Sequence, residues 1–361
     1  RGACRRGEGG RVHRAARRAA REERSPALSR RDWMASACVG LGGEGRSRAP
    51  TVMHFSREKG KQVDLDDFEL LKVLGKGSFG KVLQVKKKDT KEIFAMKILH
   101  KDAVLERNQL EHTKAERHIL ESVQHPFLVG LRYAFQSEAK LYMVLDFLNG
   151  GELFFHLKAS GRFSEARAKL YGAEILLALG HLHSLDIVYR DLKPENILMD
   201  AEGHVRLTDF GLAVDRLYQT HAYGAQNEDV PFRWMPPEAL KKRRFSEKSD
   251  VWSFGVTAWE LLTDGEVPFA FVSSDETVAE RVCGGERLPR PANCPDALWT
   301  LLHRTWAEKA ADRPKFTELA AELHSVLRTY MQVCVKTDEA TTLDLGRLFV
   351  LPTTSRRNVV T

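Results

Sequence analysis

The sequence of 361 residues contains few cysteines, no long hydrophobic run and no lysine in its first 50 residues. Its five cysteines are odd in number and include no CxxC pair, which argues against a disulfide framework or a cysteine-ligated zinc site and favours an intracellular, cytoplasmic location. No stretch reaches about 18 consecutive apolar residues, so we expect no transmembrane helix and no membrane partner.

Positive charge is concentrated at the N-terminus. Residues 1–50 carry 13 arginines and five acidic residues, a net charge of +8, so the remaining residues carry −1 of the total of +7. We therefore expect no specific nucleic-acid partner for the folded part. Residues 1–62 have few aromatic side chains and predict a disordered, arginine-rich segment. This segment is interpreted either as a solvated tail or as a tail for RNA, acidic partners or organelle import.

The periodicity of apolar residues predicts a mixed chain. Strands are expected over 68–74, 81–85, 93–98, 128–135 and 140–147, with one helix over 109–122. From residue 152 onward helices dominate, over 164–184, 248–262, 297–306 and 316–327. The folded body is therefore of the α+β class, with a strand-rich part over 68–147 and a larger helical part over 148–327. Residues 328–361 form a tail without a clear pattern.

The first motif that indicates chemistry is glycine-rich and lies between two predicted strands. It reads Gly75-Lys76-Gly77-Ser78-Phe79-Gly80-Lys81-Val82, and glycines allow the backbone to approach phosphate oxygens. A dinucleotide fingerprint or a plain tight turn would show similar spacing, but a dinucleotide loop opens a helix, whereas a strand follows here. Lys97 follows in an apolar strand, where a lysine is costly unless it is paired.

The second motif combines carboxylate, amide and amine groups. The segment Tyr189–Asn196 contains Asp191, Lys193 and Asn196, and Asp209 follows in Asp209-Phe210-Gly211. Carboxylate and amide oxygens are the hard ligands that Mg²⁺ prefers.

With both motifs in this order, the chain resembles the eukaryotic protein kinases over about residues 68–327. The resemblance implies a bilobal α+β protein kinase fold, with ATP between a small β-rich N-lobe (68–147) and a larger helical C-lobe (148–327). It also implies ATP- and Mg²⁺-dependent transfer of the γ-phosphate to a hydroxyl group of a protein substrate.

The resemblance assigns roles to individual residues of the N-lobe. Gly75, Gly77 and Gly80 would cover the phosphates of ATP, and Lys97 would hold the α- and β-phosphates and pair with Glu116. The other residues implied to line the nucleotide site are Leu74, Lys76, Ser78, Phe79, Val82, Ala95, Leu145, Asp146, Leu148, Glu152 and Leu198.

The catalytic roles fall to the C-lobe. The resemblance implies that Asp191 orients the substrate hydroxyl and accepts its proton, and that Lys193 neutralises the transferring phosphoryl group. It also implies that Asn196 and Asp209 hold Mg²⁺. The aromatic pair Tyr189 and Phe210 matches the family's regulatory spine.

The two halves resemble different kinase groups. Gly150–Phe154 and Lys193-Pro194-Glu195 are similar to the AGC group of serine/threonine kinases, whereas Pro231–Leu240 and Ser249–Val256 are similar to tyrosine kinases. We weigh the catalytic loop more and expect a Ser/Thr hydroxyl as acceptor; tyrosine or dual specificity is the alternative. A gene-model fusion near residues 212–220 would also explain why the two halves resemble different kinase groups.

Two further alternatives concern the activity itself. A pseudokinase scaffold would lack one of Lys97, Asp191, Asn196 and Asp209, and all four are present. A small-molecule kinase is disfavoured by the protein-kinase elements Pro237-Glu238 and Asp250.

Recognition and regulation follow from the resemblance. Glu152 and Glu195 predict a preference for basic residues upstream of the target hydroxyl. Arg190 is expected to bind a phosphate on the activation loop, at Tyr223 in preference to Tyr218 or Thr220. The oligomeric state stays open.

Overall fold

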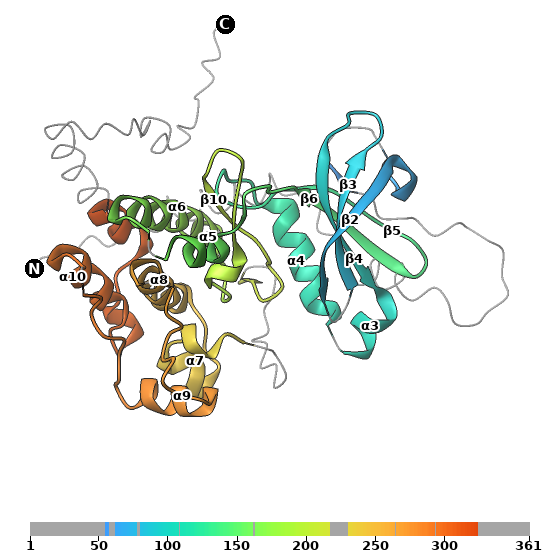
Figure 1. Ribbon diagram of the computed structural model, residues 1–361. Helices are drawn as coiled ribbons and strands as arrows, with labels where there is room; N and C mark the ends of the chain where they lie inside the picture. The colour runs from blue at the N-terminus through green and yellow to red at the C-terminus, as the bar shows by residue number, and fades with distance from the viewer. Residues whose placement is uncertain are drawn as a thin grey trace, which may run out of the picture. The chain divides into compact units, whose positions relative to one another are not determined.

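The computed structural model describes residues 55–57, 62–77, 80–107, 109–161, 163–216, 230–263, 265–292 and 294–323. These residues belong to two units (Figure 1). Unit 1 comprises the chain up to Glu106 together with Leu131–Leu145, and unit 2 comprises Arg107–Gly130 and the chain from Asp146 onward. The sequence predicted a single boundary at 147/148, with residues 107–130 in the strand-rich part. In the structure these residues belong to unit 2, because their helix packs against a strand of that unit.

Unit 1 is built on a six-stranded sheet in the order β1-β5-β6-β4-β3-β2. Its elements are β1 (Phe55–Ser56), η1 (Leu65–Asp67), β2 (Phe68–Gly77), β3 (Gly80–Lys87), β4 (Ile93–His100), α3 (Lys101–Glu106), β5 (Leu131–Gln136) and β6 (Lys140–Asp146). The pairs β2–β3, β3–β4 and β5–β6 are antiparallel, which is the pattern that short turns between consecutive strands permit.

The core of unit 1 follows the two-residue period of its strands. In β4, Phe94, Met96 and Ile98 are buried, while the alternate side chains point to the opposite face of the sheet. Aromatic rings complete this core: Phe68 stacks on Phe135 with ring centroids 6.2 Å apart. The buried face thus fixes the register, and the other face is left for the residues that the sequence assigned to the nucleotide.

The first strand corrects part of the expected disorder of residues 1–62. Phe55 and Ser56 pair with Ala134 and Tyr133 of β5 and form the edge strand of the sheet. Nε of Arg57 donates a hydrogen bond to the main-chain oxygen of Leu131 at 2.6 Å. An open sheet edge offers unpaired backbone groups, so this short segment is ordered by hydrogen bonds that composition does not reveal. The other residues before Gln62 lie outside the described residues.

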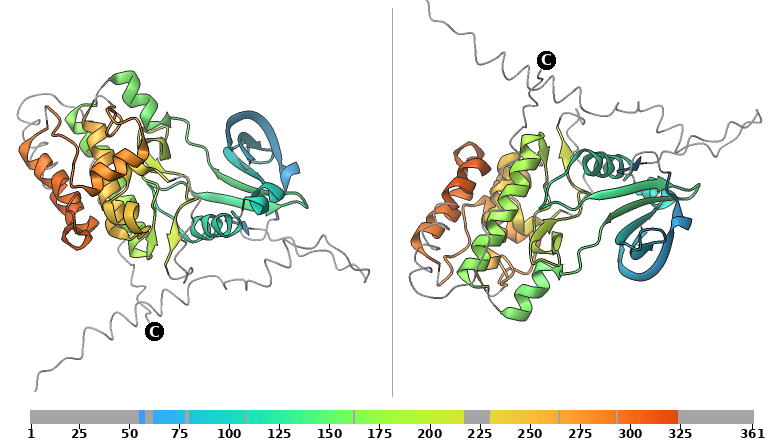
Figure 2. Two further views of the ribbon diagram at one scale, coloured as in Figure 1. Left: turned by 90° about the horizontal axis from the view of Figure 1, so that it is seen from below. Right: turned by 90° about the horizontal axis from the view of Figure 1, so that it is seen from above.

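Unit 2 is mainly helical (Figure 2). Its elements are α4 (Leu110–Ser122), β7 (Gly151–Glu152), α5 (Leu153–Ser160), α6 (Glu165–Ser184), β8 (Ile187–Val188), η2 (Pro194–Asn196), β9 (Ile197–Met199), β10 (Val205–Leu207), β11 (Val214–Asp215), η3 (Phe232–Trp234), α7 (Pro237–Lys242), α8 (Glu247–Leu262), α9 (Asp275–Cys283), α10 (Asp296–Thr305) and η4 (Ala310–Asp312). A last helical stretch is described over 316–323.

Helix α8 is the centre of unit 2. Ser246 caps its N-terminus in a capping box with Ser249, and the helix contacts α6 and α10. The apolar residues Ile175, Leu179 and Leu182 share one face of α6, and all three are buried. Both helices are therefore held by tertiary packing more than by intrinsic propensity.

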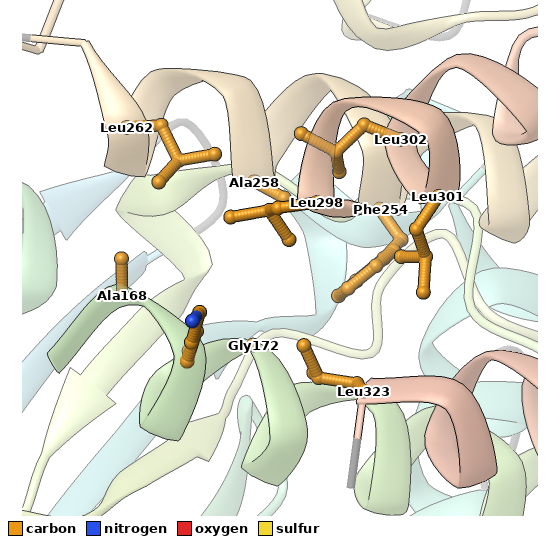
Figure 3. A pocket seen from close by; sticks show the side chains of 10 residues that line it. Ala168, Gly172, Phe254, Ala258, Leu262, Leu298, Leu301, Leu302 and Leu323 are labelled. Carbon is orange, nitrogen blue, oxygen red and sulfur yellow. The ribbon is translucent and has the colours of Figure 1, made fainter. Parts of the chain in front are cut away.

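A small apolar cavity lies between these helices (Figure 3). Its walls include Gly172 of α6, Phe254 and Ala258 of α8, and Leu301 of α10. Its volume of about 20 Å³ leaves room for roughly one water molecule, so it is a packing defect. Among the described residues, no helix combines the length and the apolar character needed to cross a membrane.

Candidate active site

The loop that carries Asp191 is anchored by a buried carboxylate from α8. Asp250 is fully buried, and its oxygens accept hydrogen bonds at 2.8 Å from the main-chain N–H groups of Tyr189 and Arg190. The imidazole Nε2 of His183, at the end of α6, lies 2.7 Å from the same carboxylate. Arg190 has a φ of +67°, which is unfavourable for a side chain with a Cβ, so these bonds stabilise a strained backbone.

Asp191 is buried and has two side-chain partners. Nζ of Lys193 lies 2.9 Å from its Oδ1, and Nδ2 of Asn196 lies 2.6 Å from its Oδ2. Asn196 also donates to the main-chain oxygen of Asp191 at 2.8 Å. The sequence motif therefore folds back on itself, and the carboxylate is held in one orientation by a cation and an amide.

Burial raises the pKa of the Asp191 carboxyl, and the negative charge of Asp209 adds to the rise. Lys193 and Asn196 act in the opposite direction and lower the pKa, without cancelling the effect of burial. A raised pKa makes a carboxylate a stronger base, which suits a group that accepts a proton.

Asp209 follows a hairpin made of β9 and β10, which pair antiparallel. Thr208 joins this hairpin to the Asp191 loop because its N–H donates to the main-chain oxygen of Asn196 at 2.9 Å. The Tyr189 hydroxyl donates to the main-chain oxygen of Thr208, and the Tyr189 ring meets Phe210 edge to face at 5.4 Å. Asp209 itself has a φ of +48°.

These contacts fit a site for Mg²⁺. The amide nitrogen of Asn196 is engaged by Asp191, so its side-chain oxygen is the group left for a cation, and Asp209 offers a carboxylate. Within the described part of the chain no cluster of three or more His, Cys, Asp or Glu could hold a metal. A protein nevertheless often supplies only one or two oxygen ligands to Mg²⁺, such as one carboxylate and one amide oxygen, and phosphates and water supply the others.

In unit 1, three adjacent strands bring the glycine-rich motif beside Lys97. Gly75 pairs with Val82, and Val82 pairs with Lys97, so Val82 and Lys97 share a face. Ala95 lies on that same face, two residues before Lys97. Gly77 pairs with Gly80 at the turn, where Ser78 and Phe79 lie outside the described residues.

The glycines of this motif differ in their surroundings. A Cβ on Gly80 would lie 1.8 Å from the main-chain oxygen of Ile98, so the strand pairing itself requires glycine there. A Cβ on Gly75 or Gly77 would meet nothing within 4 Å. The open space beside these two glycines is compatible with a phosphate approaching the backbone.

The other predicted nucleotide residues are divided between the units. Leu74, which is exposed, and Leu145 belong to unit 1. In unit 2, Glu152 pairs with Leu198 across β7 and β9. Asp146 accepts a hydrogen bond from the N–H of Gly130 at 3.0 Å.

Two predicted residues lie in surroundings that the sequence did not reveal. Arg190 is buried, and its guanidinium lies 4.7 Å from the ring centre of Phe245. Glu116 is buried on α4. Tyr223, Tyr218 and Thr220 lie outside the described residues.

Two structural supports of the site were not assigned a site role from the sequence. Asp250 was noted only as a family element, and its bonds to the Asp191 loop span about 60 residues. Arg313 is buried and donates to both carboxylate oxygens of Glu238, at 2.7 and 2.8 Å. The motif Asp312-Arg313-Pro314 was the available signal, but it does not name the partner.

Comparison with known proteins gives a consistent result. The family model described as "Protein kinase domain" matches residues 68–324. "Protein kinase 2" of Dictyostelium discoideum is 52% identical over 66% of this chain and 48% of its own length. The human "Ribosomal protein S6 kinase alpha-3" is 48% identical over 63% of this chain and 30% of its own length.

A third relative is matched over more of its length. The human "Serine/threonine-protein kinase Sgk2" is 40% identical over 76% of this chain and 74% of the relative. The chain spans about half the length, or less, of the first two relatives.

Proposed function

This chain belongs to the protein kinase family, and from that membership we propose that it transfers the γ-phosphate of ATP to serine and threonine hydroxyls of protein substrates. The observation that carries the proposal is the arrangement around Asp191, a buried carboxylate with a raised pKa in contact with Lys193 and Asn196. The names of similar proteins, among them two serine/threonine-protein kinases of Arabidopsis thaliana, support the choice of hydroxyl.

The residues of unit 2 would act on the acceptor. Asp191 orients the substrate hydroxyl and accepts its proton at a carboxylate oxygen, and Lys193 fixes that carboxylate while offering a positive charge to the phosphoryl group in transfer. Asn196 and Asp209 would hold Mg²⁺. ATP with Mg²⁺ supplies the phosphoryl group and neutralises its charge. The protein then accelerates phosphoryl transfer mainly by positioning the reacting groups and by neutralising the negative charge of the transition state.

The residues of unit 1 would act on the nucleotide. The backbone at Gly75, Gly77 and Gly80 would cover the phosphates. Lys97 would hold the α- and β-phosphates, with Glu116 of α4 as the partner that the family resemblance assigns to it. The apolar side chains Val82 and Ala95 lie on the same face as Lys97 and would contact the adenine ring.

The direct test is the loss of transfer in charge-neutral variants. We expect Lys97→Met and Asp209→Asn to abolish phosphorylation while thermal melting stays close to that of the wild type, because both side chains act on the transition state. Asp275→Asn is the matched control, since the Asp275 side chain is half exposed and lies far along the chain from Lys97 and Asp209. Near-wild-type activity in either variant would contradict the assigned roles.

Tyrosine or dual specificity is the second candidate, and one feature favours it. The segment Pro231–Leu240 resembles that of tyrosine kinases. In the sequence, Asp229-Val230-Pro231 stands where a serine/threonine kinase has its Gly-Thr pair. Phosphoamino-acid analysis of a degenerate peptide library treated with the purified chain separates the possibilities. Phosphoserine and phosphothreonine support the proposal, whereas phosphotyrosine alone overturns the choice of hydroxyl.

We also propose that substrates carry basic residues upstream of the target hydroxyl. Glu152 in β7 and Glu195 in η2 are both exposed, and these two elements contact one another. Exposed carboxylates in neighbouring elements attract a guanidinium, most strongly when the pair is bidentate. Replacing both with glutamine should remove the preference for arginine on a peptide array. Wild-type selection of acidic or random residues there contradicts it.

Regulation by phosphorylation is the last part of the proposal. Tyr223 is proposed as the activating site, with Arg190 as its partner. Arg190 directly precedes Asp191, and a guanidinium such as its own pairs strongly with a phosphate. Tyr223→Phe should lower activity several-fold, and active protein should carry phosphate there. A silent Phe variant of an unmodified, active protein would remove this switch.

A further inference from the structure

A run of consecutive basic residues ends helix α7 and begins the segment that follows it. All of its side chains are exposed, and they belong to Lys241, Lys242, Arg243 and Arg244. The acidic residue before the run, Glu238, is engaged by Arg313, which donates to both of its carboxylate oxygens. The run therefore presents concentrated positive charge on the surface of unit 2, although the chain after residue 50 carries a net charge of −1.

The backbone of this run is ordered by the end of α7. The N–H of Arg243 donates to the main-chain oxygen of Ala239 at 3.0 Å, and that of Arg244 donates to the main-chain oxygen of Glu238 at 3.3 Å. Arg243 has a φ of +50° and a ψ of 34°, the left-handed conformation that glycine usually adopts after a helix. This conformation is unfavourable for a residue with a Cβ, and strained residues of this kind are concentrated at functional sites. The observed strain points to a role for the arginine side chain.

Two ring contacts tie the basic run to the residues around Asp191. The guanidinium of Arg243 lies 5.6 Å from the ring centre of Phe232, in η3. Phe245 directly follows the run, and its ring centre lies 4.7 Å from the guanidinium of Arg190. Both phenylalanines pack against the same small apolar cluster. Because Arg190 immediately precedes Asp191, the basic run lies beside the loop that would act on the acceptor hydroxyl.

The chemistry of the run favours an anionic ligand. A guanidinium stays charged at every physiological pH and can bind a carboxylate through two parallel N–H donors. The carboxylates of Glu152 and Glu195 are proposed above to select basic residues upstream of the target hydroxyl. A substrate with acidic residues downstream would then meet a charge of opposite sign on each side of the hydroxyl. Such complementarity favours one direction of the bound peptide over the reverse.

We propose that Arg243 and Arg244, with the adjoining lysines, form a subsite for acidic side chains of the substrate on the downstream side of the target hydroxyl. The inference rests on the proposed function and names a substrate class for it, serine or threonine followed by aspartate or glutamate. The guanidinium groups would bind the carboxylate by charge-assisted hydrogen bonds. No covalent bond changes at this subsite, so it acts on the selection of the peptide and not on the transfer step.

The test compares kcat/KM of the purified full chain on serine peptides that share an upstream arginine. The reference peptide has only alanine after the serine, and the others carry a single aspartate or lysine at one of those positions. The wild type should use at least one aspartate peptide about twofold to fivefold better than the reference, the range for an exposed ion pair, mainly through a lower KM. This preference should weaken as the salt concentration rises.

Variants of the run separate a substrate subsite from a merely solvated surface. The preference for aspartate should disappear in the double variant Arg243→Gln/Arg244→Gln, and Arg243→Glu/Arg244→Glu should prefer a lysine peptide. Arg281→Gln is the matched control, since Arg281 is an exposed arginine of α9, which contacts α7, and it pairs with Glu286 at 3.4 Å. The control should keep the wild-type preference.

The variant Arg243→Gly separates recognition from folding. Glycine suits the φ of +50°, so this variant should melt no earlier than the wild type and still lose part of the preference. Equal use of the aspartate and alanine peptides by the wild type, or a preference that survives in the double Gln variant, would overturn the inference. A loss of preference confined to variants that melt earlier would overturn it as well. A folded wild type that phosphorylates none of the peptides would instead overturn the proposed function.

Discussion

Oδ1 of Asp250 accepts a hydrogen bond at 2.8 Å from the main-chain N–H of Arg190, which lies 60 residues earlier in the chain. The second oxygen, Oδ2, accepts a hydrogen bond from the main-chain N–H of Tyr189 at 2.8 Å and one from Nε2 of His183 at 2.7 Å. Three donors from two segments thus meet on one buried carboxylate. The conformation of the loop that presents Asp191 depends on α8 as much as on its own sequence.

Removing that carboxylate should damage stability and activity together. Asp250→Ala leaves the N–H groups of Tyr189 and Arg190 without their acceptor, so we expect a loss of about 2–6 kcal/mol in the free energy of unfolding, at about 1–3 kcal/mol for each buried unsatisfied group. Urea unfolding and kcat measure the two effects. Asp275→Ala should change stability by less than about 0.5 kcal/mol, because Asp275 is half exposed. Equal behaviour of the two variants would contradict the anchoring role.

The fold illustrates what the sequence could and could not predict. The strands around Gly75 and Lys97 and helix α4 were predicted because their periodicity is local. Strand β5 begins at Leu131, not at 128, because Leu128 forms a bridge with Leu207 in unit 2. A local pattern cannot show such a long-range partner.

The candidate site shows the same division. The residues of the Asp191 motif were predicted, and their contacts lie within six positions of one another. The anchor Asp250 was missed as a site residue because its partners are about 60 residues away. Strands β7, β8 and β11 were also missed, since two residues are too few to show an alternation.

Glu260 predicts a pH-dependent stability. Burial raises the pKa of its carboxyl well above the usual range, and Glu195 adds to the rise, while the hydrogen bond from Trp234 Nε1 at 2.7 Å opposes it. An acid with a raised pKa in the folded state stabilises the protein below its unfolded pKa, and that stability is lost as the pH rises toward the folded pKa.

The neutral variant Glu260→Gln keeps an oxygen for Trp234 and has no charge to bury. Its melting temperature relative to wild type should therefore increase as the pH is raised from about 4.5. Thermal melts of both proteins over a pH series measure this difference. A constant difference across the series would show that Glu260 does not take up a proton on folding.

Two glycines of unit 2 should respond in opposite ways to the same substitution. A Cβ on Gly172, in α6 beside the small cavity, would lie 3.7 Å from Leu323 Cδ2. We expect Gly172→Ala to stabilise by about 0.5–1 kcal/mol, from helix propensity and ordinary packing. A Cβ on Gly255 would lie 1.9 Å from Thr305 Oγ1, so Gly255→Ala should destabilise by about 1–3 kcal/mol. Chemical unfolding checks both signs, and a shared sign contradicts the packing of α8 against α10.

The ion pair between Arg313 and Glu238 should be essential for the stability of unit 2. Arg313 is fully buried, lies 4.9 Å from the ring centre of Trp252 and makes two hydrogen bonds to Glu238. Glu238→Ala leaves a buried guanidinium without its anionic partner, which costs about 3–5 kcal/mol. Glu286→Ala, which disturbs only an exposed pair with Arg281, is the control and should be nearly silent. Similar melting temperatures for both variants would contradict the buried pair.

The proposed activity is tested most directly by incubating the purified chain with radiolabelled ATP, Mg²⁺ and a degenerate peptide library, beside its Asp191→Asn variant, and identifying the labelled amino acids. The arrangement around Asp191 predicts phosphoserine and phosphothreonine from the wild type and no transfer above background from the variant. Equal transfer by both proteins, or no transfer by a folded wild type, would contradict the assignment of Asp191 as the residue that accepts the proton of the substrate hydroxyl.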